Sequence, residues 1–274
     1  MSIQQEPEIQ AQARFLALDT STTSLAVSVI ENDKVLHEIN AYGVRNHSVR
    51  ILSIIEEALK VSNTTNTQVQ GIAVGIGPGS YTGTRIAVTA AKTLAWAWEI
   101  PVVGISSLHA LAYGGYTHGM NKLAEDSDKD NKVRSSWIIP LLDARRGQVF
   151  TALFSMDHEE HIPNRLEQDG IRLMETWVEQ LISLIETLKV EDRPDSVWIV
   201  GDVSLHAEAA MKLSSLLGDH LHIVPYDLEG RFVGILGADR LLKGDMDDMH
   251  ALVPNYTQLA EAEANLLRAL KEGR

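Results

Sequence analysis

The chain has 274 residues, of which 45% are hydrophobic, so it can form one large domain or two modest ones with a proper core. The sequence contains no cysteine, which excludes a disulfide framework and any catalysis or metal binding by thiolates. Its formal net charge of −13 at pH 7 is the opposite of what a protein needs to hold nucleic acid through its own surface.

The beginning of the chain and its apolar runs indicate neither export nor membrane insertion. Residues 1–14 are polar and lack the apolar segment of a signal peptide, so we expect a disordered tail. No apolar run reaches the ~18 residues that a membrane span needs. We therefore expect a cytoplasmic protein without a membrane partner.

Strands and helices are expected to alternate over residues 15–115, which we interpret as the N-terminal lobe. The helix at 48–61 has apolar residues over a wide arc, so it is expected to contact two neighbours. The expected strands are 15–18, 25–30, 35–42, 71–75 and 102–105, and the expected helices are 48–61, 84–98 and 107–113.

A charged segment separates this lobe from a second one. Residues 121–135 are poor in apolar side chains, so we expect a flexible loop over 116–136 and a C-terminal lobe over 137–274. In that lobe two strands flank a turn after Asp143. The other expected elements are strands at 197–200 and 221–224, and helices at 177–188, 205–217, 233–243 and 261–271.

The two lobes begin alike. FLALDTSTTSLAVSV at 15–29 resembles IPLLDARRGQVFTAL at 139–153, and Asp19 corresponds to Asp143. Each segment is a strand that ends in Leu-Asp, then a polar turn, then a second strand. This similarity and the alternation of strands and helices predict two duplicated α/β lobes with mostly parallel sheets, each led by a hairpin.

A glycine-rich loop at 75–83 joins an expected strand to an expected helix. The free N–H groups of a helix N-terminus suit an anion, but the Lys-Ser/Thr of a P-loop is missing, since Thr84 and Arg85 follow Gly83. The alternative is that the glycines allow close packing. Likewise, the polar turn after Asp19 is either an ordinary hairpin turn or a phosphate contact. The candidate nucleotide or phosphate contacts are Asp19, Ser21, Thr22, Gly77, Gly79 and Ser80.

No spacing in the sequence indicates a metal site or a catalytic group. His158 and His161 are three residues apart in a charged segment that reads as a loop, and the other histidines have no matching partner. There is no HExxH motif and no GxSxG nucleophile motif. We therefore predict no metal ligands and no catalytic residues.

Four segments resemble the bacterial TsaB family, whose members are tRNA threonylcarbamoyladenosine biosynthesis proteins. GPGSYTGTRI and LDARRG are the most specific motifs. The similarity is dense over 15–113, present at 141–154 and thin afterwards, where Gln258 replaces the arginine of a Pro-x-Tyr-x-Arg element. The segments are LALDTSTTSLAVSV, RNHSVRILSIIEEAL, GIAVGIGPGSYTGTRIAVTAAKTLAWAWEIPVVGISSLHAL and LLDARRGQVFTALF.

The resemblance implies a two-lobed actin-like/sugar-kinase-like (ASKHA) fold and a role as the non-catalytic partner of TsaD. TsaD transfers a threonylcarbamoyl group to the adenosine beside the anticodon of tRNAs that read codons beginning with A. Ser107 and Leu111 stand where TsaD has two metal-binding histidines, and neither can replace imidazole on a transition metal. The resemblance also implies a TsaE-like ATPase partner, tRNA contact through the complex, and ATP or ADP at the level of the complex only.

Two helices are the candidate partner surface. On the helix at 84–98, Trp96 shares a side with polar residues, so it is either a stray surface aromatic or an anchor for a partner. The same surface would let the free protein form a homodimer. The candidate interface residues are Arg50, Ile51, Ile54, Ile55, Ala58, Arg85, Thr89, Lys92 and Trp96.

Two other functions remain open at this point. One is a metallopeptidase of the glycoprotease type, which would need a metal site. The other is a small-molecule kinase or ATPase of the same fold, which would need tight ATP binding by the isolated chain. We expect instead no stoichiometric zinc or iron, weak tRNA binding by the chain alone and no independent activity.

Overall fold

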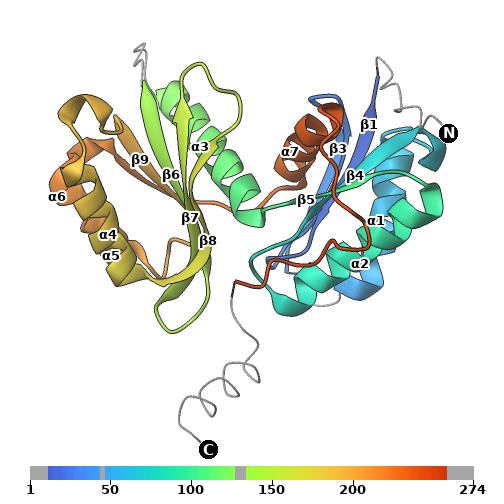
Figure 1. The fold of residues 1–274 in the computed structure, drawn as a ribbon, viewed down its shortest axis with the longest axis horizontal. Helices are drawn as coiled ribbons and strands as arrows, with labels where there is room; N and C mark the ends of the chain where they lie inside the picture. The colour runs from blue at the N-terminus through green and yellow to red at the C-terminus, as the bar shows by residue number, and fades with distance from the viewer. Residues whose placement is uncertain (1–11, 44–46, 127–133, 258–274) are drawn as a thin grey trace, which may run out of the picture.

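Two five-stranded sheets form the centre of the molecule, and helices cover both faces of each (Figure 1). The structure is a computed structural model that describes residues 12–43, 47–126 and 134–257. The predicted helix at 261–271 and most of the predicted tail at 1–14 lie outside these ranges.

The first sheet has the strand order β3-β2-β1-β4-β5. The first three strands pair antiparallel, whereas β1, β4 and β5 are parallel. Its strands are β1 (Arg14–Asp19), β2 (Leu25–Glu31), β3 (Lys34–Ala41), β4 (Val69–Gly75) and β5 (Val102–Ile105).

The second sheet repeats this arrangement with the order β10-β9-β6-β7-β8. Strand β6 takes the place of β1 between an antiparallel hairpin and a parallel strand. The repeat confirms the predicted duplication and the two-lobed ASKHA fold. The prediction of mostly parallel sheets is wrong, because each sheet has two antiparallel and two parallel pairings. Its strands are β6 (Ser135–Asp143), β7 (Gln148–Asp157), β8 (Asn164–Leu173), β9 (Ser196–Gly201) and β10 (Leu221–Pro225).

The helices form three layers around the two sheets (Figure 1). Helices α1 (His47–Val61) and α2 (Tyr81–Trp98) cover the outer face of the first sheet. Helices α3 (Ser107–Asp126) and α7 (Gly230–Leu242) lie between the sheets. The outer face of the second sheet is covered by α4 (Met174–Thr187), α5 (Ala207–Met211) and α6 (Ser214–Leu217). Short 3-10 turns at Asn66–Gln68, Val190–Asp192 and Gly218–His220 complete the described elements.

Helix α3 differs from the expectation, because it continues to Asp126 through residues that we predicted as loop. Tyr116 and Met120 pack against the core between the sheets, and the ring of Tyr116 meets that of Trp198 edge to face. This packing stabilises the helix despite its polar sequence. The residues predicted as a flexible loop therefore belong in part to a helix that joins the lobes.

The end of the described chain also departs from the predicted division at residue 137. Helix α7 packs on β1, β2 and β4 of the first sheet, and residues 245–257 run along α2. Small residues permit this approach: a Cβ on Gly237 would lie 2.1 Å from Ala73 Cβ, and one on Gly234 would lie 2.4 Å from Ile30 Cγ1. The C-terminal part of the chain thus completes the first lobe.

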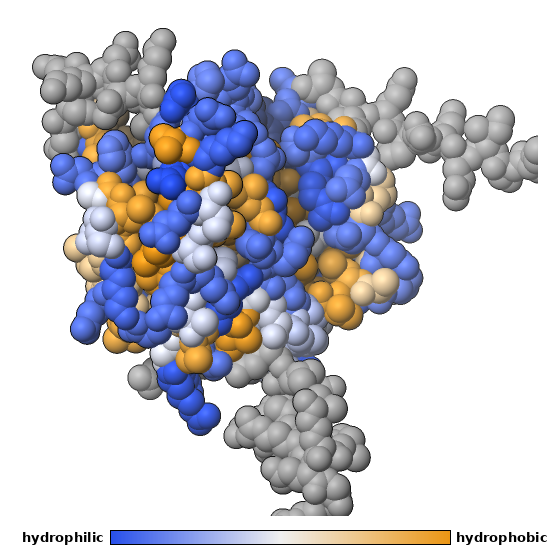
Figure 2. Space-filling view, turned by 60° about the vertical axis from the view of Figure 1, so that its left-hand side comes forward, coloured by the Kyte–Doolittle hydropathy of each residue, from blue (hydrophilic) through white to orange (hydrophobic). Residues whose placement is uncertain are grey.

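On the surface, hydrophobic side chains occur in several areas bordered by hydrophilic ones (Figure 2). Among the helices that the structure describes, none has the length and apolar character to cross a membrane.

Candidate partner surface and glycine loop

The glycine loop and the first hairpin turn lie directly against each other. Ser80 N donates to Ser21 O at 2.6 Å, and Thr20 Oγ1 donates to Gly83 O at 2.6 Å. A Cβ on Gly79 would lie 2.3 Å from Ser21 O, and one on Gly83 would lie 1.9 Å from Thr20 O. Glycine is therefore required at these positions because another part of the backbone occupies the space of a side chain.

Asp19 is completely buried under this loop. Its Oδ1 accepts a hydrogen bond from Ser21 N at 2.6 Å, and its Oδ2 accepts one from Ser107 Oγ at 2.6 Å. Burial raises the pKa of Asp19, although the hydrogen bonds from Ser107 and Ser21 oppose that rise. Ser107 Oγ also accepts from Gly77 N at 3.0 Å, so one hydroxyl connects the carboxyl group, the loop and the start of α3.

The six residues predicted to contact nucleotide or phosphate are brought together, but not as an open site. Asp19 and Ser21 are buried and Gly77 is covered, so they do not face solvent here. The side chain of Ser80 caps α2 by accepting from Gly83 N at 3.2 Å. These contacts favour the packing interpretation of the loop. For Thr22, Gly79 and Ser80, which keep some exposure, nucleotide contact remains a prediction.

A cavity of about 380 Å³ lies where elements of the two lobes meet. Three carboxylates line it, those of Asp202, Asp227 and Glu229, together with Tyr42 and His118. Burial raises the pKa of Asp202, and the negative charge of Asp227 adds to the rise. Carboxylates repel free phosphate groups but also bind nucleotides through a divalent cation, so this cavity does not decide on the kinase alternative.

The apolar residues of α1 that we predicted at the partner interface belong to the core instead. Ile51, Ile54 and Ile55 are each 3% exposed, and Ala58 is fully buried, all of them beneath α1 against the first sheet. Their prediction as interface residues is wrong for the folded chain, because their side of the helix faces β2 and β3.

Besides Val61 at its last position, the exposed apolar residues of α1 are Val49 and Leu52, with 75% and 60% of their surface accessible. They are three residues apart, so they neighbour each other on the helix surface. Their exposure places them outside the buried side that carries Ile51 and Ile55. The wide apolar arc in the sequence indicated that some apolar residues would lie outside the core-facing stripe, but not which ones. Arg50, also predicted at the interface, is exposed.

The C-terminal residues 245–257 cover part of the outward side of α2. Arg85 donates from Nε to Tyr256 Oη at 2.8 Å, and its guanidinium lies 3.9 Å from the ring centre of Tyr81. Lys92 Nζ donates to Leu252 O at 2.9 Å. Arg85 and Lys92, which we predicted at the partner interface, thus already make hydrogen bonds within the chain. Thr89 is exposed beside them.

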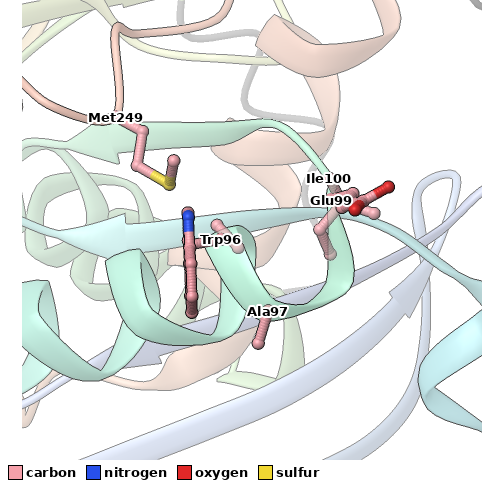
Figure 3. A pocket seen from close by; sticks show the side chains of 6 residues that line it. Trp96, Ala97, Glu99, Ile100 and Met249 are labelled. Atoms are coloured by element: carbon pink, nitrogen blue, oxygen red, sulfur yellow. The ribbon is translucent and has the colours of Figure 1, made fainter.

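Trp96 remains open to solvent, with 69% of its surface exposed. It borders a cavity of about 580 Å³ that is also lined by Met249 and Ile100. Figure 3 shows the thioether of Met249 facing the indole of Trp96, while Ala97 points away from it. The exposed aromatic and its neighbour from the C-terminal segment form a composite apolar surface. Sequence analysis missed Met249, because only the fold brings it to α2.

Ser107 and Leu111, which stand where TsaD has two metal-binding histidines, both have structural roles in this fold. Ser107 Oγ is engaged by Asp19 and Gly77, and Leu111 is fully buried in the core between the sheets. Across residues 12–43, 47–126 and 134–257, no group of three histidine, aspartate or glutamate side chains is arranged to hold a metal ion. The donor set at this place is therefore unsuited to a transition metal.

Comparison with known proteins agrees with this geometry. The family model for TsaD, described as tRNA N6-adenosine threonylcarbamoyltransferase, matches residues 25–164. The tRNA threonylcarbamoyladenosine biosynthesis protein TsaB of Bacillus subtilis is 33% identical over 260 residues, which cover 94% of this chain and 99% of that protein. The protein of the same name from Escherichia coli is 32% identical over 144 residues, covering 53% of this chain and 56% of that protein.

A solved structure has the same fold. YeaZ from Pseudomonas aeruginosa superposes with a TM-score of 0.64 at 18% identity, covering 89% of this chain and 99% of that chain. With the fold, the glycine loop and the near full-length similarity in agreement, this chain belongs to the TsaB family of tRNA threonylcarbamoyladenosine biosynthesis proteins.

Proposed function

We propose that the chain is the non-catalytic partner of a TsaD-type transferase in the complex that forms threonylcarbamoyladenosine in tRNA. The substrates are tRNAs that read codons beginning with A, modified at the adenosine beside the anticodon. The chain supplies a binding surface rather than reacting groups, and it acts in the cytoplasm.

The replacement of the two metal histidines supports this proposal most directly. At these positions the chain has Ser107, whose hydroxyl donates a hydrogen bond to Asp19, and Leu111, which is buried in the core. A transferase that uses a metal ion at this place needs imidazole ligands, which Ser107 and Leu111 cannot supply. These two positions therefore supply no ligands for such a centre, and a partner role explains why the rest of the fold is retained.

The partner surface that we propose has two parts. One is the exposed side of α1 with Val49 and Leu52, and the other is Trp96 on α2 with Met249 beside it. Exposed aromatic and aliphatic side chains of this kind are typical centres of protein interfaces. When the transferase is absent, a second copy of the chain can occupy the same surface and form a homodimer.

Capture of the transferase tests this surface. The TsaD-type protein from the same cell is immobilised and the chain is added as wild type, Trp96→Ala or Leu52→Asp. Removing a buried aromatic anchor commonly costs about 2 kcal/mol or more, so we expect binding at least ~30-fold weaker. Val190→Asp is the matched control, because Val190 is 80% exposed in the second lobe. Circular dichroism checks that each variant is folded.

Two outcomes would contradict the proposal. If both variants bound the immobilised transferase as strongly as the wild type, the assigned surface would be wrong. If the transferase fully threonylcarbamoylated tRNA without this chain, the proposed role as its partner would be wrong. We further propose that a TsaE-like ATPase joins the complex and that ATP or ADP binds only there, which titration of nucleotide into the chain alone and into the complex would distinguish.

A further inference from the structure

The turn between β6 and β7 has an unusual backbone for its sequence. Arg145 and Arg146 have φ of 66° and 55°, and Gly147 follows with φ of 73°. Positive φ at successive positions of a hairpin turn favours asparagine and glycine, since a larger L side chain is strained there. Two adjacent arginines in this conformation are therefore not explained by the local folding of the hairpin.

The turn is held firmly in this conformation. Gln148 N donates to Arg145 O at 2.9 Å, and Met174 N donates to Gly147 O at 2.9 Å. The Oδ1 atom of Asp143 accepts from Arg145 N at 3.2 Å. Strain of this kind persists where the surrounding contacts impose it, and it is concentrated at functional sites.

Neither guanidinium group has a partner among the residues that the structure describes. Arg145 and Arg146 are exposed, and within the described chain no hydrogen bond, ion pair or ring contact involves either side chain. Every other described arginine except Arg50 has such a partner. The nearby carboxyl group of Asp143 is bonded instead to Arg145 N and to His206 Nε2. In a chain with 37 acidic and 24 basic side chains, two unpaired arginines on one rigid turn are a specific arrangement.

We propose that Arg145 and Arg146 bind phosphate groups of the RNA backbone in the assembled complex. The inference rests on the proposed function, which supplies the tRNA. A guanidinium group matches the oxygens of a phosphate, and a rigid turn lowers the loss of backbone freedom on binding. Because the chain as a whole repels RNA, contact must be local, and an exposed pair of this kind provides it.

The position of the turn supports RNA rather than the transferase as the ligand. The turn follows the carboxyl end of β6 in the second lobe, whereas α1 and α2 cover the far face of the first sheet (Figure 1). The arginines therefore lie apart from the surface assigned to the protein partner.

Replacement of both arginines tests the inference, because a purely structural role and a role in RNA binding predict different results. In Arg145→Asn/Arg146→Asn the strain falls, so the melting temperature should rise by a few degrees. The complex with the transferase should bind tRNA several-fold more weakly. The slope of log K against log salt should be lower by about 1.4 to 1.8, because two phosphate contacts are lost. Arg134→Gln is the control, since Arg134 is also exposed but pairs with Asp195.

The readouts separate the two proposals. Capture of the transferase should be unchanged in the double variant, and loss of capture would overturn the inference by assigning the turn to an acidic protein surface. An unchanged salt slope and tRNA affinity would also overturn it. If the wild-type chain captures no transferase, the proposed function fails and the inference fails with it.

Discussion

His109 shows how a single side chain connects the two lobes. Its Nε2 atom lies 2.8 Å from Pro163 O in the β7–β8 loop, and its ring stacks on Phe154 at a centroid distance of 4.7 Å. Burial lowers the pKa of His109 to about 4, outweighing the opposing hydrogen bond to Pro163, and the charge of Arg165 lowers it further. The contact is therefore made by the neutral imidazole at pH 7.

This pKa predicts a pH dependence of stability. Since the folded pKa is below the ordinary value of 6.5, the unfolded chain takes up the proton first as pH falls. The contribution of His109 to the free energy of unfolding is fully present above pH 6.5 and is lost as pH falls from 6.5 to about 4. The free energy of unfolding decreases over this range by on the order of 3 kcal/mol. His109→Gln should remove that part of the pH dependence.

Urea unfolding at several pH values between 7 and 4 measures the effect. His158→Gln serves as the control, because the His158 side chain is 65% exposed and should leave the pH dependence as in the wild type. An equal loss of stability on acidification in His109→Gln and the wild type would show that this histidine does not couple folding to pH.

At the scale of elements, the close approach of β4, the glycine loop and the first hairpin leads to a second prediction. A Cβ on Gly75 would lie 1.7 Å from Asp19 Oδ2, which is itself fixed by hydrogen bonds. Gly75→Ala should therefore destabilise the chain by about 1–3 kcal/mol or more, as overpacking of a buried site does.

The midpoint of urea unfolding checks this cost. Gly170→Ala is the matched control, because its new Cβ would meet only the end of the flexible Arg172 side chain, at 3.1 Å. If Gly75→Ala unfolds at the wild-type urea concentration, the loop is looser than the contacts with Asp19 require.

Local sequence predicts some of these elements and not others. The strand–turn–strand similarity around Asp19 and Asp143 was enough to predict duplicated lobes, because it lies in local sequence. The edge strand β8 was missed, since its residues are largely polar and gain their order by pairing with β7. The packing of α7 on β1 was also missed, because contacts between segments about 200 residues apart leave no local signal.

The candidate site was predictable only in part for the same reason. Periodicity identified the apolar arc of α1 but did not tell which side would be covered, so Ile54 was assigned to the interface and Leu52 was not. On α2, Trp96 was assigned correctly to an exposed side. The contacts of Arg85 and Lys92 with the C-terminal segment depend on the tertiary fold.

At the scale of the whole molecule, one core cluster extends from the first sheet to the second. It includes Phe15 and Ala73 of the first sheet, Leu108 of α3, and Phe154 and Trp198 of the second sheet. Because the lobes share this core, opening one exposes apolar surface of the other. We expect them to unfold together rather than as separate domains.

Tryptophan fluorescence tests this cooperativity. In a Trp96→Phe/Trp98→Phe variant, the remaining tryptophans Trp137, Trp177 and Trp198 all belong to the second lobe. Their fluorescence and the far-UV circular dichroism of the whole chain should give coincident urea transitions. Two separated midpoints would mean that the lobes are independent despite the shared core.

The return of α7 to the first sheet has a consequence for synthesis on the ribosome. About 140 residues separate Ile105, at the end of β5, from Leu242, at the end of α7, which at roughly 5–20 residues per second takes about 7 to 28 seconds. During that interval the inner face of the first sheet emerges without the helix that covers it. The nascent chain therefore presents an apolar strand surface early and buries it last, which makes this period the one in which chaperones matter most.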